Sequence, residues 1–415
     1  MWMNKSAFIG QYILIGLLAC KFLSEVIYSV RFPYPYESFE ISDWLINYEG
    51  GFVRRGLIGQ LLLALYTVIP FNVKSTIIAF DLLWCALFIA LMIRVCRRSQ
   101  WSFMPVIFAL ALMSGGVPRY RRDFLIMLAV YAIYALYMRY QSSRRQGWLW
   151  LSIGLICAFL LMYEPVFFLT VPVLALLYYG SLSGQKVLLR LVKTFGVFAL
   201  PLAVMAFVCL WKGDAAQAQL IWQSWADLFI RYPQEGGMPP IGAGVGFLGH
   251  DMLETFRFHV DILFCINRWP EPTALLAALL LLCCYPLVYM IVTRVPQVDV
   301  KQQCLTNNVQ QADLSSIFIV QLVAMSPMLT VLSCDLERSI PYIVYTTFML
   351  VCLAQQYQTS LPVPQWLNSA SAAIQSSLDT LRPLRSFWGY TAVYLLFLLV
   401  LFAWMITAKG FLILS

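Results

Sequence analysis

The sequence contains little charge. Its 415 residues include 28 Lys or Arg and 20 Asp or Glu, together 12% of the chain. Soluble globular proteins carry about 25% charged residues. Because 61% of the residues are also apolar and the mean hydropathy is +0.76, the composition disfavours a soluble enzyme and predicts an integral membrane protein.

Histidines and paired cysteines are scarce as well. The chain has two histidines, and its 11 cysteines form no CxxC pair. Most of the cysteines lie in apolar runs, where Cys behaves as a small hydrophobe. A secreted disulfide scaffold is therefore disfavoured. The net charge of +8 is better explained by membrane topology than by a nucleic-acid partner, and no such partner is expected.

Long apolar runs recur along the whole chain and predict an all-α polytopic protein with a single transmembrane domain, residues 1–415. At about 20 residues per span, roughly eleven helices fit into this length. The predicted spans are 7–29, 76–93, 102–118, 123–138, 147–162, 165–180, 194–211, 272–293, 315–333, 339–354 and 388–408.

The apolar segment 56–71 decides the orientation of everything that follows it. If it lies in the membrane interface without crossing, three short basic connections face the cytoplasm, as the positive-inside rule favours. These connections contain Arg94, Arg97, Arg98, Arg139, Arg144, Arg145, Lys186, Arg190 and Lys193. We therefore expect an interfacial helix at 56–71 and a cytoplasmic N-terminus.

This topology places most acidic residues on the outer side. Fifteen of the 20 carboxylates fall in the loops expected to be extracytoplasmic. The larger of these loops are 30–75 and 212–271, and 355–387 becomes a cytoplasmic connection. The glycine-rich part of 212–271 resembles no dinucleotide-binding motif, because no strand precedes it, and is expected to be a mobile loop that gates substrate access.

The first outer loop combines acidic, aromatic and basic residues. Asp43 and Glu49 are two of its four carboxylates, and Arg54 and Arg55 follow a Gly-Gly pair. A turn there, followed by a helix, would form an anion site from arginines and a helix N-terminus. The alternative is an aromatic belt at the interface with weak surface ion pairs.

A second outer segment, RYRRD, contains Arg121 and Arg122 directly before Asp123. Arginines on the outer side run against the positive-inside tendency, and an anionic substrate would explain them. The alternative is that Asp123 caps the following helix while the arginines remain hydrated.

Three further polar residues are candidates for substrate binding. Glu164 stands between two spans that almost no loop separates, so it is either paired, protonated or at headgroup level. Arg338 lies at the outer end of a later span, where an internal ion pair is the alternative. His250 shares a helical face with Glu254, but two metal ligands without a third make a weak metal site, and hydrogen bonding to substrate is favoured.

These features resemble integral-membrane glycosyltransferases of the C type (GT-C), over roughly the first 180 residues. Asp43, with Glu49 as a rival, matches the acid of the first outer loop in that superfamily. Arg121, Arg122 and Asp123 match its second-loop signature, and 56–71 matches its interfacial helix. The YEGGFVRRGLIG segment is also similar to multispan proteins encoded with bacterial surface-polysaccharide genes. O-antigen polymerases and ligases are neighbours in function.

The resemblance implies a protein of the bacterial inner membrane that transfers a sugar from a polyprenyl-phosphate or polyprenyl-diphosphate donor to a glycan or glycolipid acceptor. Asp43 or Asp123 would act as the base, with Glu49 as the rival of Asp43. Arg54, Arg55, Arg121 and Arg122 would bind the phosphate, and Arg338 and His250 the sugar. A Mg²⁺ or Mn²⁺ ion is compatible but not required. The alternatives are a transporter or flippase of lipid-linked sugars, and a non-catalytic assembly subunit.

Overall fold

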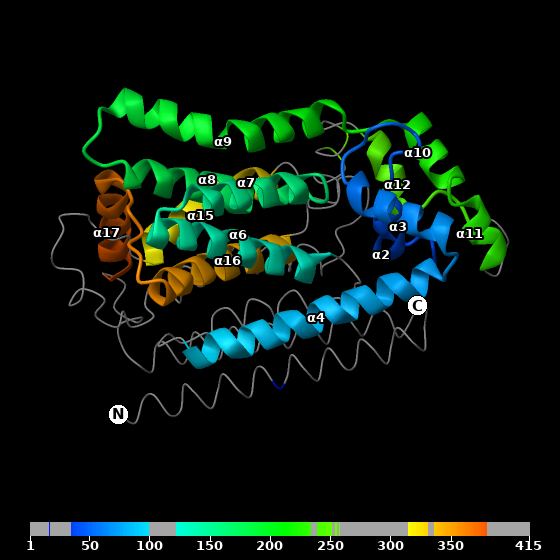
Figure 1. Ribbon diagram of the computed structural model, residues 1–415, viewed down its shortest axis with the longest axis horizontal. Helices are drawn as coiled ribbons and strands as arrows, with labels where there is room; N and C mark the ends of the chain where they lie inside the picture. The colour runs from blue at the N-terminus through cyan, green and yellow to red at the C-terminus, as the bar shows by residue number, and fades with distance from the viewer. Residues whose placement is uncertain are drawn as a thin grey trace.

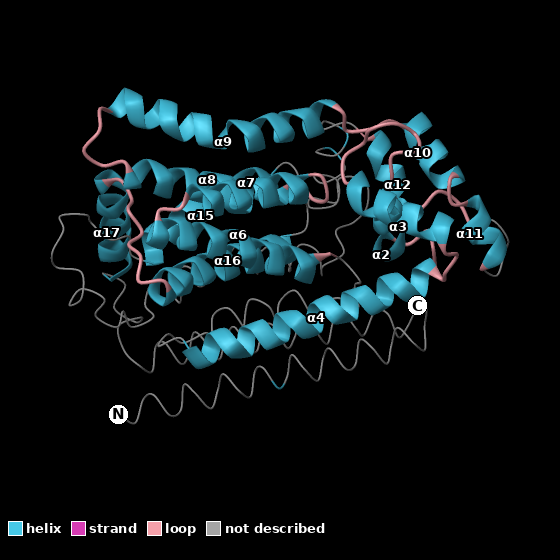
Figure 2. Cartoon of the chain, viewed as in Figure 1, coloured by secondary structure: helices cyan, strands magenta, loops and turns pink. Residues whose placement is uncertain are grey.

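The computed structural model of the chain is entirely helical in the part that it describes. This part comprises residues 35–98, 122–233, 239–250, 314–330 and 336–379, together with Gly16, Glu254 and Arg257. These ranges contain helices and loops and no strand (Figure 2). The predicted all-α class is therefore confirmed for the described residues.

The helices of the larger part run side by side in a bundle (Figure 1). They are α4 (Val73–Arg98), α6 (Asp123–Ser143), α7 (Gln146–Leu160), α8 (Pro165–Ser181), α9 (Val187–Leu210), α15 (Leu314–Thr330) and α16 (Leu336–Gln356). Each coincides with one predicted span. The other four predicted spans, 7–29, 102–118, 272–293 and 388–408, lie outside the described residues, Gly16 excepted.

Within the described part, α4, α6 and α9 are long and apolar enough to cross a membrane, and the remaining bundle helices are apolar but shorter. Pro172, Pro201 and Pro327 lie inside α8, α9 and α15. Membrane helices tolerate such prolines because neighbouring helices and polar side chains satisfy the freed backbone groups. The fold is thus that of a helical membrane protein.

Helix α9 begins earlier than predicted. It starts at Val187, seven residues before the expected span, and so includes Arg190 and Lys193. Long basic side chains favour helix and extend their charged ends away from apolar surface. Arg190 Nη2 donates to the carbonyl oxygen of Tyr179 at 2.9 Å, which ties this basic turn to the end of α8.

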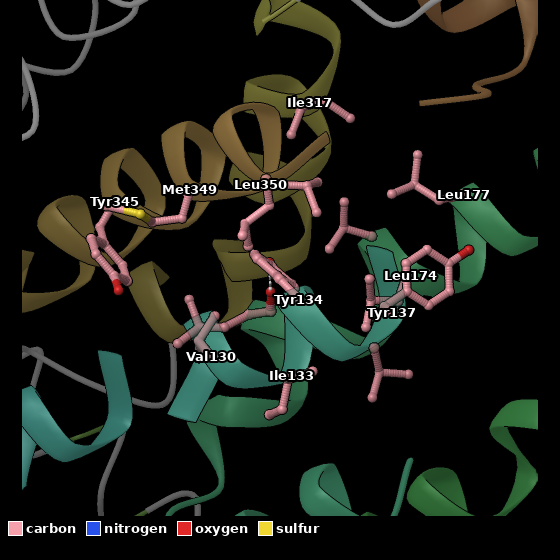
Figure 3. Close-up of a cluster of buried hydrophobic side chains, with 14 of the residues drawn as sticks. Val130, Ile133, Tyr134, Tyr137, Leu174, Leu177, Ile317, Tyr345, Met349 and Leu350 are labelled. Atoms are coloured by element: carbon pink, nitrogen blue, oxygen red, sulfur yellow. Dashed lines mark hydrogen bonds between the residues drawn. The ribbon is translucent and has the colours of Figure 1, made fainter. Parts of the chain in front are cut away.

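The bundle interior is apolar, with a few satisfied polar groups (Figure 3). Tyr134, on α6, is fully buried between α8 and α16 and donates its hydroxyl to the carbonyl oxygen of Leu169. Gln321, on α15, donates to the same Tyr134 hydroxyl at 2.7 Å. These bonds satisfy the buried Tyr134 hydroxyl and the amide nitrogen of Gln321, which would destabilise the core without partners.

A smaller unit caps one end of the bundle. We define the end unit as residues 35–71, 212–233 and 239–250. Its helices are α2 (Phe39–Ser42), η1 (Asp43–Leu45), α3 (Gly56–Val68), α10 (Ala215–Gln223), α11 (Ala226–Arg231), α12 (Ala243–Gly246) and η2 (Phe247–Gly249). A crosswise helix, α17 (Gln365–Asp379), lies at the opposite end of the bundle (Figure 1).

The end unit has an apolar core of its own, to which both predicted outer loops contribute. Trp225 is fully buried and donates its indole N–H to the carbonyl oxygen of Leu45 at 2.8 Å. Tyr66 donates to the Asp227 carboxylate at 2.9 Å. Trp225 and Asp227 of the second outer loop are thus packed against the first loop, and the expected gating role of the glycine-rich part stays a prediction.

Helix α3 belongs to the end unit and does not run along the bundle (Figure 1). Its 13 residues span about 20 Å at 1.5 Å per residue, whereas the hydrocarbon core of a bilayer is about 30 Å thick. One face packs into the end unit, while Leu61, Leu65 and Val68 are exposed. Both observations agree with the predicted interfacial helix.

Candidate functional site

An ion-pair network joins the end unit to the bundle. Arg55 Nε lies 2.8 Å from Glu164 Oε2, and Arg54 Nε lies 3.9 Å from Glu164 Oε1. Asp43 Oδ1 lies 3.7 Å from Arg55 Nη1, and Asp43 Oδ2 lies 3.3 Å from Arg122 Nη2. We call these five residues the junction network. Three guanidinium groups face two carboxylates, so the network carries one excess positive charge.

The backbone at Arg55 directs two consecutive arginines toward the same carboxylate. Arg55 precedes α3 and has φ 65°, in the left-handed region that residues other than glycine rarely adopt. Neighbouring side chains normally diverge along a helix or strand. Here both Arg54 and Arg55 reach Glu164. Such conformations persist where the surrounding structure enforces them, and they concentrate at functional sites.

Glu164 occupies the short turn between α7 and α8. It is the N-cap residue of α8, and Pro165 takes the first helical position, where its missing N–H costs nothing. Burial opposes the charge of the Glu164 carboxylate, but Arg55 and Arg54 outweigh it and hold its pKa below the usual range. Pairing, one of the three alternatives for Glu164, is therefore present, and its partners are arginines of the first loop.

Arg54 and Arg55 differ in how many partners their guanidinium groups contact. Burial works against the charge of Arg55, but Glu164 and Asp43 outweigh it and raise its pKa. Burial lowers the pKa of Arg54, whose one hydrogen bond among the described residues runs from Nη2 to the carbonyl oxygen of Phe247 at 3.1 Å. A guanidinium has five N–H donors. Within the described ranges the other N–H groups of Arg54 have no hydrogen-bond acceptor, which suits them to an incoming anion.

Arg122 is almost completely buried, with 2% of its side chain exposed. It donates to the carbonyl oxygen of Met162 at 2.8 Å and to the backbone carbonyl of Asp43, and its guanidinium lies over the ring of Trp44. Burial lowers its pKa despite the nearby Asp43. Arg122 is therefore the most buried arginine of the network, and it connects the first loop to the α7–α8 turn.

Asp43 is the more accessible of the candidate bases in the network region. Its side chain is 22% exposed, whereas the whole of Asp123 is 8% exposed. Asp123 occupies the first position of α6, directly after the N-cap residue Arg122. Its carboxylate accepts a short hydrogen bond from the hydroxyl of Tyr342, on α16. Nothing in the local sequence around Tyr342 indicates this contact.

The remaining candidates are not joined to the network by the described contacts. Glu49 is exposed and accepts a hydrogen bond from Gln60 at 3.3 Å. His250 is half-exposed, with Nδ1 3.9 Å from Glu254 Oε2. Its backbone is extended, with φ −77° and ψ 133°, so His250 is not part of the expected helix. Arg121 and the side chain of Arg338 lie outside the described residues.

A resident divalent cation does not fit the described donors. Asp43 and Glu164 are each paired with two arginines, and a cation would have to displace them. Among the described residues, no group of three or more His, Cys, Asp or Glu side chains is placed to hold a metal ion. The network is instead suited to a negatively charged ligand.

Comparisons with known proteins return no relative: neither a protein-family model, nor a curated protein, nor a solved structure matches this chain.

Proposed function

We propose that the chain is a membrane glycosyltransferase that uses a polyprenyl-phosphate or polyprenyl-diphosphate sugar donor at the extracytoplasmic face. The product would be a surface polysaccharide or glycolipid of a bacterial envelope. The observation that carries this proposal is the junction network, in which arginines outnumber carboxylates at one end of an apolar bundle. A phosphate with a lipid tail matches both properties of that place.

In the transfer step, the carboxylate of Asp43 and the two arginines Arg54 and Arg55 have separate roles. Asp43 takes the proton of the acceptor hydroxyl while the oxygen of that hydroxyl bonds to the anomeric carbon of the donor sugar. The bond from that carbon to the phosphate oxygen breaks, and the phosphate leaves with the electron pair. Arg54 and Arg55 stabilise the charge that develops on the leaving group.

The surroundings of the network suit a lipid-linked donor. Helix α3 starts directly after Arg55 and exposes Leu61, Leu65 and Val68. An apolar helix of this length lying in the interface would bring the phosphate-binding arginines to headgroup depth. The lipid tail of the donor would then remain in the bilayer while its phosphate meets Arg54 and Arg55.

A transporter or flippase of lipid-linked sugars is the alternative, and Asp81 is the observation that favours it. Asp81 is 5% exposed and lies within α4. Transporters need polar groups at mid-membrane that are reached from both sides. An Asp81→Asn variant that abolishes function, together with an Asp43→Asn variant that retains it, would favour transport.

The anion site is tested by binding of farnesyl phosphate to the purified protein in lipid nanodiscs. Arg54→Gln removes a charge-assisted partner and should weaken binding about 10- to 100-fold. The matched control is Arg231→Gln, since Arg231 is an exposed arginine of the end unit that pairs with Asp227. Equal affinity in both variants would contradict the assignment.

The activity itself is tested by glycolipid and polysaccharide profiles of a deletion strain, complemented with the wild type or with Asp43→Asn. Loss of one branch sugar would indicate a single-sugar transferase, and accumulated single repeat units a polymerase. A donor trapped in the inner leaflet would indicate a flippase. An unchanged profile would reject the proposal.

A further inference from the structure

We infer that the glycine-rich segment of the second outer loop positions Asp43, and that Gly244 is the residue through which it acts. This inference rests on the proposed function, because it concerns the carboxylate that would serve as the base there. It assigns a positioning role to the IGAGVG segment, residues 241–246, which takes no part in the proposed reaction.

Asp43 lies at the start of η1, directly after α2, and the short helix α12 packs against this turn. Ala243 donates its backbone N–H to the carbonyl oxygen of Glu37 at 2.8 Å. Gly244 donates its backbone N–H to Ser42 Oγ, also at 2.8 Å. The first N–H groups of α12 thus bond to the two ends of the segment that leads into Asp43.

The contact is closer than any side chain at position 244 would allow. A Cβ atom placed on Gly244 would lie 2.7 Å from the backbone nitrogen of Asp43 and 2.8 Å from its Cα. Both obstructing atoms belong to the backbone, so the clash cannot be relieved by rotating a side chain. Glycine at this position is therefore required for α12 to rest on Asp43.

Arg122 holds the same residue from the side of the bundle. It contacts the Asp43 carboxylate and its carbonyl oxygen, and it also bonds to the carbonyl oxygen of Met162. Asp43 is thus fixed between α12 of the end unit and the α7–α8 turn. Because a displacement of about 1 Å can cost two orders of magnitude in rate, the second loop sets the geometry of the proposed base.

The sequence supplies a matched control two residues away. Gly246 lies in the same short helix, has φ −59°, and a Cβ placed on it would meet only Ile241 Cγ2 at 3.8 Å. Gly246→Ala is therefore accommodated without displacement. Gly244→Ala adds the same methyl group, but against the backbone of Asp43. Comparing the two variants therefore distinguishes a displacement of Asp43 from a general effect of alanine in this segment.

The test compares both variants, at equal membrane abundance, in three measurements: restoration of the surface glycan in the deletion strain, affinity for farnesyl phosphate, and hydrogen exchange of residues 38–48. Gly244→Ala should restore less than about a tenth of the glycan while its affinity for farnesyl phosphate stays within about threefold of the wild type, because Arg54 and Arg55 keep Glu164 as a partner. It should also accelerate exchange in 38–48. Gly246→Ala should match the wild type throughout.

If Gly244→Ala restores the glycan to the same level as Gly246→Ala does, the inference is overturned. If deletion of the chain leaves the glycan unchanged, the proposed function fails, and hydrogen exchange alone decides about the contact. Faster exchange in Gly244→Ala than in Gly246→Ala then supports it, and equal exchange overturns it. If Gly244→Ala does not accumulate, Ser42→Ala, which removes the acceptor of the Gly244 N–H without a clash, replaces it in the same measurements.

Discussion

Glu164 is the residue through which pH should act on the junction network. Its pKa is lowered in the folded protein, so its contribution to stability is present above its unfolded pKa of about 4.3 and is lost as the pH falls through the lowered value. We expect Glu164→Gln to unfold at a lower temperature than the wild type at pH 7, because it leaves the Arg55 charge without its closest partner. Below about pH 4 the difference should shrink.

The measurement is the unfolding temperature of both proteins in detergent between pH 3 and pH 7. Other carboxylates titrate in the same window, so the quantity that matters is the difference between the two proteins at each pH. Glu254→Gln is the control, because Glu254 is exposed and its ion pair with half-exposed His250 is long, at 3.9 Å. A difference for Glu164→Gln that does not change with pH would contradict the expectation.

The sequence pointed to the charged residues of this network as candidate site residues, because a charged side chain near a membrane costs free energy and is therefore rarely present without a role. Arg54, Arg55 and Glu164 stood out for that reason, and the structure brings them together. The sequence did not predict which carboxylate each arginine would meet. Arginine does not favour the left-handed conformation, so we attribute that of Arg55 to the packing around it. The local sequence therefore does not predict this conformation.

At the scale of elements, the close packing of α3 on η1 depends on a single glycine. A Cβ placed on Gly59 would clash with the carbonyl of Ile46 and lie 2.9 Å from the carbonyl oxygen of Trp44. Gly59→Ala should therefore destabilise the protein by about 1–3 kcal/mol, the usual cost of overpacking a well-packed contact.

The matched control is Gly154→Ala on α7, where a Cβ would meet nothing within 4 Å. This exposed helical position should be neutral or gain up to about 1 kcal/mol, because alanine favours helix over glycine. Thermal unfolding of both variants in the same detergent measures the contrast. Similar unfolding temperatures would show that α3 can move away from η1 without loss.

The helices themselves followed from apolar runs, and seven predicted spans fall on described helices. The end unit did not follow from sequence, for a physical reason. Its core is built from contacts between residues more than 150 positions apart, such as Leu45 with Trp225, and periodicity within one segment carries no information about them. The sequence also did not predict that Gly244 of IGAGVG is a site of close backbone approach to Asp43.

At the scale of the whole molecule, the two ends of the bundle have different charged groups. The junction network lies where α6 and α8 begin, whereas the basic connections between α6 and α7 and between α8 and α9 lie at the end next to α17 (Figure 1). The positive-inside rule predicts that the basic end faces the cytoplasm and that the network faces outward. A lipid-linked donor in the outer leaflet can reach the network only in this orientation.

Labelling with a membrane-impermeant maleimide tests this orientation. Gln223→Cys places a thiol on an exposed position of the end unit, and Ser183→Cys places one on an exposed position of the basic end. We expect Gln223→Cys to react in intact spheroplasts and Ser183→Cys to react only after permeabilisation, each measured above the labelling of the wild-type cysteines. The reverse pattern would put the junction network on the cytoplasmic side, where Asp43 and Arg54 could not act on a donor held in the outer leaflet.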